Sequence, residues 1–168
     1  MNMPAIPTDA DLLVQAEALG RALAASNQTM VTAESCSGGW IAKVVTDVAG
    51  SSSWFEAGLV VYSYEAKQAL LGVRAETLLR EGAVSEETAL EMVSGALIRA
   101  GANLAVAVTG IAGPSGGTPE KPVGSVWIAW TRRGGYPVAK LFHFHGDREA
   151  VRRQTVAAAL DGLLAMLA

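Results

Sequence analysis

The sequence predicts an α/β fold, a three-layer α/β/α sandwich around a mixed, mostly parallel sheet of about five strands. Runs of apolar and β-branched residues alternate with longer segments of helical periodicity, as in parallel sheets covered by helices on both faces. A glycine-containing turn between the last two strand patterns predicts a hairpin, which adds antiparallel pairing. With 168 residues, 51% of them hydrophobic, the chain can bury a core, and we expect a single domain over 1–168.

The elements of the first half follow from helical spacing, caps and apolar runs. Leucine and alanine at helical spacing predict a helix over 8–25, capped by Thr8 or Asp9. The next elements are a short strand closing at Val31, a helix over 40–48, the buried strand "AGLVVY" at 57–62, a helix after the N-cap Ser63 that ends near Leu71 before Gly72, and a short helix over 76–80.

The second half begins with a helix opened by Ser85 and continues with the buried strand "NLAVAVTG", 104–109. A glycine-rich loop follows. Two strands over 123–131 and 138–145 flank "RRGG", which is typical of a hairpin turn. Asp147 then caps a long final helix with leucines at helical spacing.

The ends of four strands carry the polar residues of interest. In open α/β sheets, ligands bind beyond the carboxyl ends of the parallel strands. The predicted strands end at "AESCSGG", "YSYEAK", "TGIAGPSGG" and "HGDREAVRR". If these strands run the same way, one edge of the sheet gathers Ser35, Ser37, Tyr62, Lys67, Thr109, Arg148 and, one turn further, Arg152.

The turn "ESCSGG" offers three side chains that could act as nucleophiles. Ser37 is interpreted first as the N-cap of a helix starting at Gly38, which leaves Ser35 without a capping task. Cys36 is interpreted as a small buried side chain. A cysteine nucleophile would need a histidine partner, and the two histidines alternate in "HFH" on one strand face. That pair lacks a third ligand with suitable spacing, so we expect no metal.

Lys67 is the most informative of these residues. The cap Ser63 places it near the first turn of a helix, where the positive end of the helix dipole disfavours a cation. Burial would lower its pKa further, and a neutral lysine can take a proton from a serine. The alternative is a solvated surface lysine.

The glycine-rich loop and the arginines after it suggest an anionic ligand. "GIAGPSGG" exposes many backbone amides, which form anion sites or oxyanion holes, although its spacing matches neither a P-loop nor a dinucleotide fingerprint. Arg148 and Arg152 add positive charge near the same edge, so a small phosphorylated ligand is predicted. The alternative is an arginine pair on the solvent side of the last helix.

Composition excludes several classes of protein. The net charge of −3 argues against a non-specific nucleic-acid binder. No window approaches ~20 apolar residues, and the N-terminus lacks the pattern of a signal peptide, so we expect neither a membrane protein nor a secreted one. The single cysteine excludes an internal disulfide and a cysteine-cluster zinc site. We expect a cytoplasmic globular protein.

Four motifs in order carry a family resemblance: "TAESCSGGWIAKVVTDVAGSSSWFEAGLVVYSYEAKQALLGV", "GAVSEETALEM", "TGIAGPSGGTPEKPVGSVWIAW" and "GDREAVRRQ". With these, the chain resembles the CinA C-terminal domain family from about Asp11 to its end. The resemblance implies a three-layer α/β sandwich, a homo-oligomer, and hydrolysis of the carboxamide of nicotinamide mononucleotide to nicotinate mononucleotide and ammonia, in pyridine nucleotide recycling. It implies no metal and no organic cofactor. A binding module without catalysis, or an amidase for a related substrate, is the alternative.

The resemblance also assigns roles to single residues. Ser35 matches the nucleophile, in preference to Ser37, and Lys67 matches the base, with Tyr62 beside it to orient the amine or shuttle the proton. For substrate binding, the matching positions are Ser37, the Gly38–Gly39 turn as a source of N–H donors, Thr109 and Gly110 in the glycine loop, and Arg148 in "GDR".

Overall fold

The computed structural model describes residues 4–168 of the chain. Its strands are β1 (Met30–Glu34), β2 (Phe55–Val60), β3 (Leu104–Gly110), β4 (Ser125–Arg132) and β5 (Val138–His143). Its helices are α1 (Asp9–Ala25), α2 (Trp40–Thr46), α3 (Tyr64–Leu71), α4 (Ala75–Glu81), α5 (Glu86–Ala100) and α6 (Arg148–Leu167), with a short 3₁₀ turn, η1 (Ser51–Ser53).

The strands form one sheet in the order β2-β1-β3-β4-β5. β1 pairs in parallel with β2 and β3, whereas β4 is antiparallel to both β3 and β5. Strands β1, β2, β3 and β5 therefore run the same way and β4 runs against them. The predicted mixed, mostly parallel sheet is confirmed, and the four parallel strand ends share one edge.

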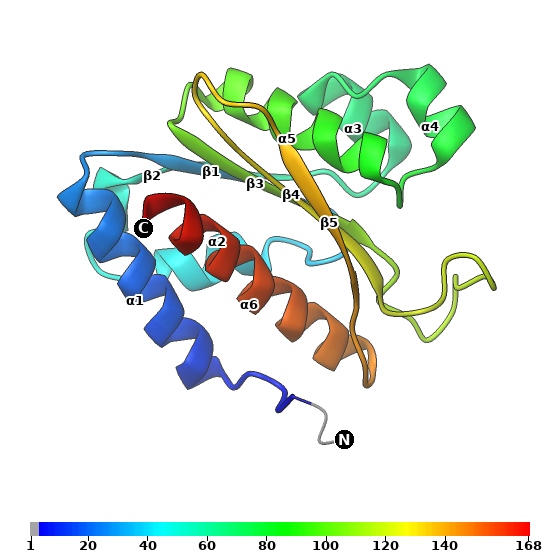
Figure 1. Cartoon of the computed structure of the whole chain (residues 1–168), viewed down its shortest axis with the longest axis horizontal. Helices are drawn as coiled ribbons and strands as arrows, with labels where there is room; N and C mark the ends of the chain where they lie inside the picture. The colour runs from blue at the N-terminus through cyan, green and yellow to red at the C-terminus, as the bar shows by residue number, and fades with distance from the viewer. Residues whose placement is uncertain (1–3) are drawn as a thin grey trace.

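Helices cover both faces of this sheet, as predicted. α1, α2 and α6 lie on one face and α3, α4 and α5 on the other (Figure 1). Each face has its own apolar cluster: Val106 and Val108 of β3 pack with the α1 and α6 side, and Ala105 and Ala107 pack with the α5 side. The small alanines allow α5 to lie close to the sheet, which brings the layer that carries α3 close to the strand ends.

Two contacts place α3 within its layer. Gly95 of α5 lies directly against the Leu71 carbonyl of α3, where a Cβ would clash with the backbone. The N-terminus of α3 is fixed by the predicted cap, because Ser63 Oγ accepts the Ala66 amide at 3.0 Å. These contacts fix the position and the start of the helix that carries Lys67.

The first strand is longer than predicted. β1 continues past Val31 to Glu34, because it lies between two parallel neighbours and pairs along its length with both. Ala33 and Glu34 gave no strand signal of their own, since both residue types are depleted in strands. Tertiary pairing decides their conformation, and it carries the strand up to Ser35.

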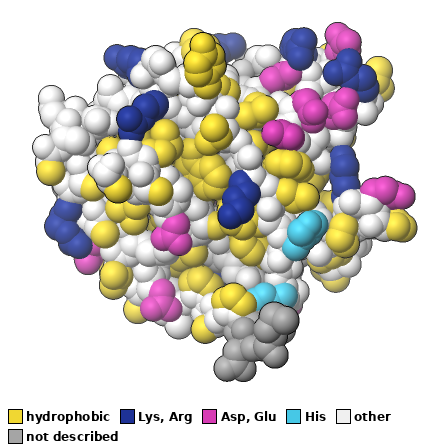
Figure 2. Space-filling view, viewed as in Figure 1, with side chains coloured by type: hydrophobic (Ala, Val, Ile, Leu, Met, Phe, Trp, Pro, Cys, Tyr) yellow, Lys and Arg dark blue, Asp and Glu magenta, His cyan; other side chains and the backbone are white. Residues whose placement is uncertain are grey.

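The surface carries mixed charge where it can be seen in Figure 2. Acidic and basic side chains lie side by side over α4 at the upper right, where Arg80 pairs with Glu76 and Glu81. Among the described residues, no helix is both long and apolar enough to cross a membrane.

Candidate active site

A cavity of about 260 Å³ opens at the carboxyl edge of the parallel strands. It is lined by residues that follow β1, β2 and β3 and by the start of α6; those that matter here are Ser35, Cys36, Tyr62, Lys67, Thr109, Gly110, Gly113 and Arg148. The chain leaves β1 toward α2 on one face and β2 toward α3 on the other, so the cavity lies where the two layers diverge.

Lys67 and Ser35 meet inside this cavity. Lys67 lies in the first turns of α3 with only 1% of its surface exposed. Its Nζ lies 2.9 Å from Ser35 Oγ, 2.9 Å from the Val61 carbonyl oxygen and 3.3 Å from the Tyr62 carbonyl oxygen. Ser35 lies in the turn between β1 and α2, and Lys67 lies in α3 on the opposite face, so the two side chains meet at the sheet edge.

The surroundings of Lys67 disfavour its charged form. Burial lowers the pKa of Lys67 below its ordinary value, against a smaller opposing influence of Cys36. Within residues 4–168, no carboxylate lies at ion-pair distance from its amine. Lys67 therefore meets the condition, burial, under which its pKa was expected to fall, and the surface-lysine alternative is wrong.

Ser37 does not cap the following helix, contrary to the first interpretation. Helix α2 begins at Trp40, and its N-cap position is Gly39, in a left-handed conformation without a side chain that could accept. The Ser37 hydroxyl instead donates to Glu34 Oε1 at 2.7 Å, and Ser37 is fully buried outside the cavity. Ser35 is therefore the serine that faces Lys67.

The cap of α2 comes from the preceding strand. Glu34 Oε1 accepts the Ile41 amide at 2.8 Å and Oε2 accepts the Ala42 amide at 2.9 Å, with Thr32 Oγ1 donating to Oε2 at 3.4 Å. Because Ser37 donates to the same carboxylate, Glu34 fixes the turn that carries Ser35. The sequence reasoning missed Glu34; a carboxylate at the end of a buried strand was the available signal.

Cys36 packs rather than reacts. It is buried, and burial raises the pKa of its thiol to about 12. His143 lies 3.5 Å from Ser125 Oγ through Nδ1, and neither it nor His145 lines the cavity. In the part of the chain that is described, no cluster of three or more metal-ligating side chains occurs.

Residues 14–167 match the family model described as the CinA C-terminal domain. The chain belongs to the CinA C-terminal domain family. It is 54% identical over 156 residues to an Escherichia coli K12 protein named nicotinamide-nucleotide amidohydrolase PncC, covering 93% of this chain and 94% of that one. A Pseudomonas putida protein of the same name is 55% identical over 146 residues, covering 87% and 91%.

Solved structures of the CinA family share the whole fold. The crystal structure of the competence/damage inducible protein CihA from Agrobacterium tumefaciens superimposes with a TM-score of 0.91 at 44% identity, covering 98% of this chain and 99% of that one. The competence damage-inducible protein A from Klebsiella pneumoniae gives a TM-score of 0.89 at 42% identity, covering 93% and 96%. The layered sheet is thus the fold of the family.

Tyr62 and Thr109 lie at the predicted edge of this CinA-family domain, but their side chains are engaged differently. Only the carbonyl of Tyr62 contacts Lys67; its side chain is 61% exposed, and its hydroxyl accepts from Arg148 at 3.2 Å. The Thr109 hydroxyl donates to the Ala83 carbonyl at 2.7 Å. Neither side chain is placed to orient the lysine amine.

The two glycines after Ser37 lie outside the Ser35 cavity. Gly38 and Gly39 line a separate cavity instead. The Gly38 amide donates to the Ser35 carbonyl at 3.0 Å, so it closes the turn and is engaged within the protein. Gly38 and Gly39 have φ of 61° and 95°, a region that favours glycine. Their role here is to shape the turn.

Proposed function

We propose that this chain hydrolyses the carboxamide of nicotinamide mononucleotide to nicotinate mononucleotide and ammonia, with Ser35 as nucleophile and Lys67 as general base. The observation that carries the proposal is the buried 2.9 Å contact between Lys67 Nζ and Ser35 Oγ. The substrate class is supported by the name of the relatives that the chain matches along most of their length. The reaction belongs to pyridine nucleotide recycling.

The hydrogen bonds of Lys67 suit a neutral amine. A neutral lysine has two N–H donors and one lone pair. The carbonyl oxygens of Val61 and Tyr62 can only accept, so they take the two donors. The lone pair then faces Ser35, the one partner whose hydroxyl can donate. This arrangement places the base and the proton it removes in contact before substrate binds.

The reaction then proceeds in two halves. As Ser35 Oγ attacks the amide carbon, its proton moves to Lys67 Nζ, and a tetrahedral oxyanion forms. Lys67 returns the proton to the nitrogen of the leaving group, ammonia departs, and an acyl ester remains on Ser35. Water attacks this ester with Lys67 again as base, which releases the carboxylate product and restores Ser35. These steps use Ser35, Lys67 and backbone amides.

The nucleophile turn supplies the oxyanion donors in this proposal. The Ser35 amide donates to the Val108 carbonyl and the Gly38 amide to the Ser35 carbonyl, so both are engaged. Among the described residues, neither the Cys36 amide nor the Ser37 amide donates to another residue, although the Cys36 amide contacts its own thiol. One such donor aimed at the oxyanion is typically worth about 3 kcal/mol.

Arg148 is the residue we assign to the 5′-phosphate. It stands at the edge of the Ser35 cavity, where its guanidinium donates to the Gly113 carbonyl at 2.7 Å and to the Tyr62 hydroxyl. Arg148→Ala should raise KM about tenfold with little change in kcat, because a charge-assisted contact to the phosphate is lost while the reacting groups stay in place. Steady-state kinetics with nicotinamide mononucleotide give both constants, and an unchanged KM would remove Arg148 from this role.

The deciding experiment is ammonia release from nicotinamide mononucleotide, compared with nicotinamide and its riboside. We expect turnover of the mononucleotide, and the same rate with a chelator present. A thermal shift on binding without release of ammonia would identify a binding module. Faster hydrolysis of another amide would show that this amide is the preferred substrate. The homo-oligomer and the cytoplasmic setting stay predictions.

A further inference from the structure

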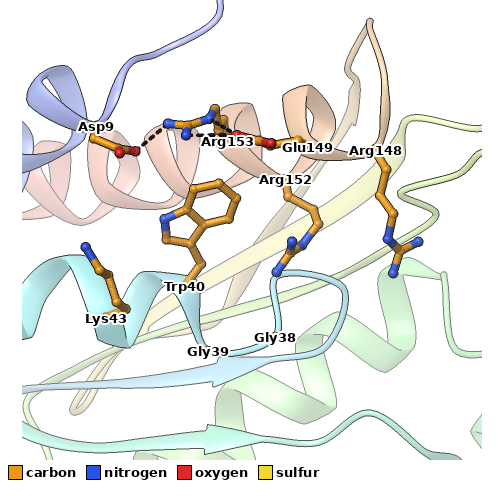
Figure 3. Close-up of a pocket in the computed structure, with 9 residues that line it drawn as sticks. All are labelled: Asp9, Gly38, Gly39, Trp40, Lys43, Arg148, Glu149, Arg152 and Arg153. Carbon is orange, nitrogen blue, oxygen red and sulfur yellow. Dashed lines mark hydrogen bonds and ion pairs between the residues drawn. The ribbon is translucent and has the colours of Figure 1, made fainter.

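A second and larger cavity lies beside the Ser35 cavity, between α1, α2 and the start of α6. Its volume is about 710 Å³, and its walls carry Trp40, Arg148, Arg152 and Arg153 (Figure 3). The proposed reaction does not use this space. Of the residues that the structure describes, only Arg148 lines both cavities.

The three arginines differ in how their charge is balanced. Arg153 pairs with Asp9 at 2.6 Å and with Glu149 at 2.9 Å, so its charge is compensated within the wall of the cavity. Within the described residues, Arg148 donates only to the Gly113 carbonyl and the Tyr62 hydroxyl. Arg152 donates only to the carbonyls of Cys36 and Ser37, and over residues 4–168 neither it nor Arg148 has a carboxylate partner.

The uncompensated pair suits a tetrahedral anion. Arg148 and Arg152 are one helical turn apart on α6, and both point away from α6 toward the loops below it in Figure 3. Like charges at this spacing destabilise a helix unless an anion lies between them. Each guanidinium uses two of its five N–H donors in the contacts above, and the remaining donors suit bidentate bonding to phosphate.

The neighbouring wall suits an organic group. The half-buried Trp40 indole projects into the cavity from α2, with the guanidinium carbons of Arg152 and Arg153 at 5.1 and 4.9 Å from the ring centre. It adds an apolar ring next to the arginine donors, and two guanidinium groups lie over that ring. We propose that this cavity is a second binding site, for a small organic phosphate monoester whose phosphate lies on Arg152 and Arg148.

Occupancy of this site opposes binding of substrate in the Ser35 cavity. Arg148 lines both cavities, and two phosphate groups near one guanidinium compete for its donors and repel each other. Such coupling is reciprocal, so each ligand weakens the other. This part rests on the proposed function: the monoester should raise KM for nicotinamide mononucleotide.

Binding is tested independently of turnover, by isothermal titration with glycerol 3-phosphate. We expect one site on the wild-type chain and a loss of affinity of about tenfold or more in Arg152→Gln. Arg99→Gln is the matched control, because Arg99 lies in α5 on the other side of the sheet. Arg152→Lys keeps the charge but loses the planar guanidinium, so it should bind glycerol 3-phosphate with intermediate affinity. This variant replaces Arg152→Gln in the test if Arg152→Gln does not fold.

A blocked active site separates the two cavities. Val84 lines only the Ser35 cavity, so Val84→Phe should leave the affinity for glycerol 3-phosphate unchanged. The proposal is overturned if the wild-type chain does not bind glycerol 3-phosphate, or if Val84→Phe abolishes binding while Arg152→Gln keeps it. It is also overturned if inorganic phosphate binds equally well, because the site would then not recognise the organic group of the ester. A wild-type chain that releases ammonia but fails this titration retains the proposed function and loses only the second site.

Discussion

Glu34 and Lys67 are both buried at the carboxyl edge of the sheet, at 0% and 1% exposure, but their surroundings are opposite. The Glu34 carboxylate receives two helix amides and two hydroxyls, so each of its oxygens accepts two hydrogen bonds. The Lys67 amine faces two carbonyls and Ser35, and in the described part of the chain it has no carboxylate partner.

The difference separates a structural charge from a reactive group. A buried carboxylate whose oxygens all accept hydrogen bonds fixes the position of its donors. A buried amine without a counter-charge is more easily neutral, and a neutral amine can accept a proton. Glu34 shapes the turn around Ser35, and Lys67 is poised to act on Ser35. Four measurements test this contrast.

The largest effect is expected at the two serines. Ser35→Ala should lower kcat by about 10⁴-fold or more, because the nucleophile is lost. Ser37→Ala is the same change two residues away and should keep most of the turnover, while costing about 1–3 kcal/mol of stability, since Glu34 loses a buried donor. Ammonia release and urea unfolding measure the two quantities. The assignment of Ser35 as nucleophile fails if Ser37→Ala abolishes turnover while Ser35→Ala keeps most of it.

Lys67→Met should lower kcat by about 10²- to 10⁴-fold through loss of the base. It should leave stability unchanged or raise it, because an apolar side chain of similar length replaces a buried amine without a counter-charge. The urea unfolding midpoints of the wild-type chain and of Lys67→Met measure the difference in stability. A strongly destabilised variant would show that Lys67 is a structural charge like Glu34.

Glu34→Gln should destabilise the chain by about 3 kcal/mol, because an amide N–H₂ would face donors that now meet an oxygen. The turnover that remains in the folded fraction should fall as well, since the Ser35 turn loses its anchor. Glu56→Gln, on an exposed β2 position, is the matched control. Unchanged stability would contradict the capping role.

The smallest effects concern pH. The lowered pKa of Lys67 means that kcat should rise as pH increases through that pKa and then level off, because the neutral amine is the active form. Between that pKa and the ordinary lysine value the unfolded chain binds one more proton, so stability should decrease as pH falls across this interval. Lys67→Met should remove this slope. A kcat that decreases with rising pH would exclude a neutral lysine base.

Much of the fold follows from local signals. The cap Ser63 predicted where α3 begins, so Lys67 was placed near a helix start at the sheet edge. The apolar run before it predicted β2, although β2 spans Phe55–Val60 and is a half-exposed edge strand, whereas a buried strand over 57–62 was expected. The glycine loop after β3 and the helix after Asp147 were also located correctly. Hydrogen bonds between residues close in sequence carry these signals, so they can be read from the chain alone.

The orientation of side chains at the edge did not follow from such signals. Ser37 was a reasonable cap by its type, yet its hydroxyl donates to the carboxylate of Glu34 at the end of β1. The Tyr62 side chain was expected to orient the Lys67 amine, but the Tyr62 hydroxyl accepts a hydrogen bond from Arg148 of α6 instead.

By itself, the sequence determined the layered fold and the stretch "AESCSGG" at the edge of its sheet. Only the tertiary structure decided that Ser35 faces Lys67, that Glu34 caps α2, and that Arg148 and Arg152 lack a carboxylate partner among the described residues. The physical reason is that a hydroxyl, an amine or a guanidinium binds whichever partner reaches it. The partners of Ser35, Arg148 and Arg152 come from elements that lie far apart in the chain, whereas Glu34 reaches Ile41 because the turn between them folds back.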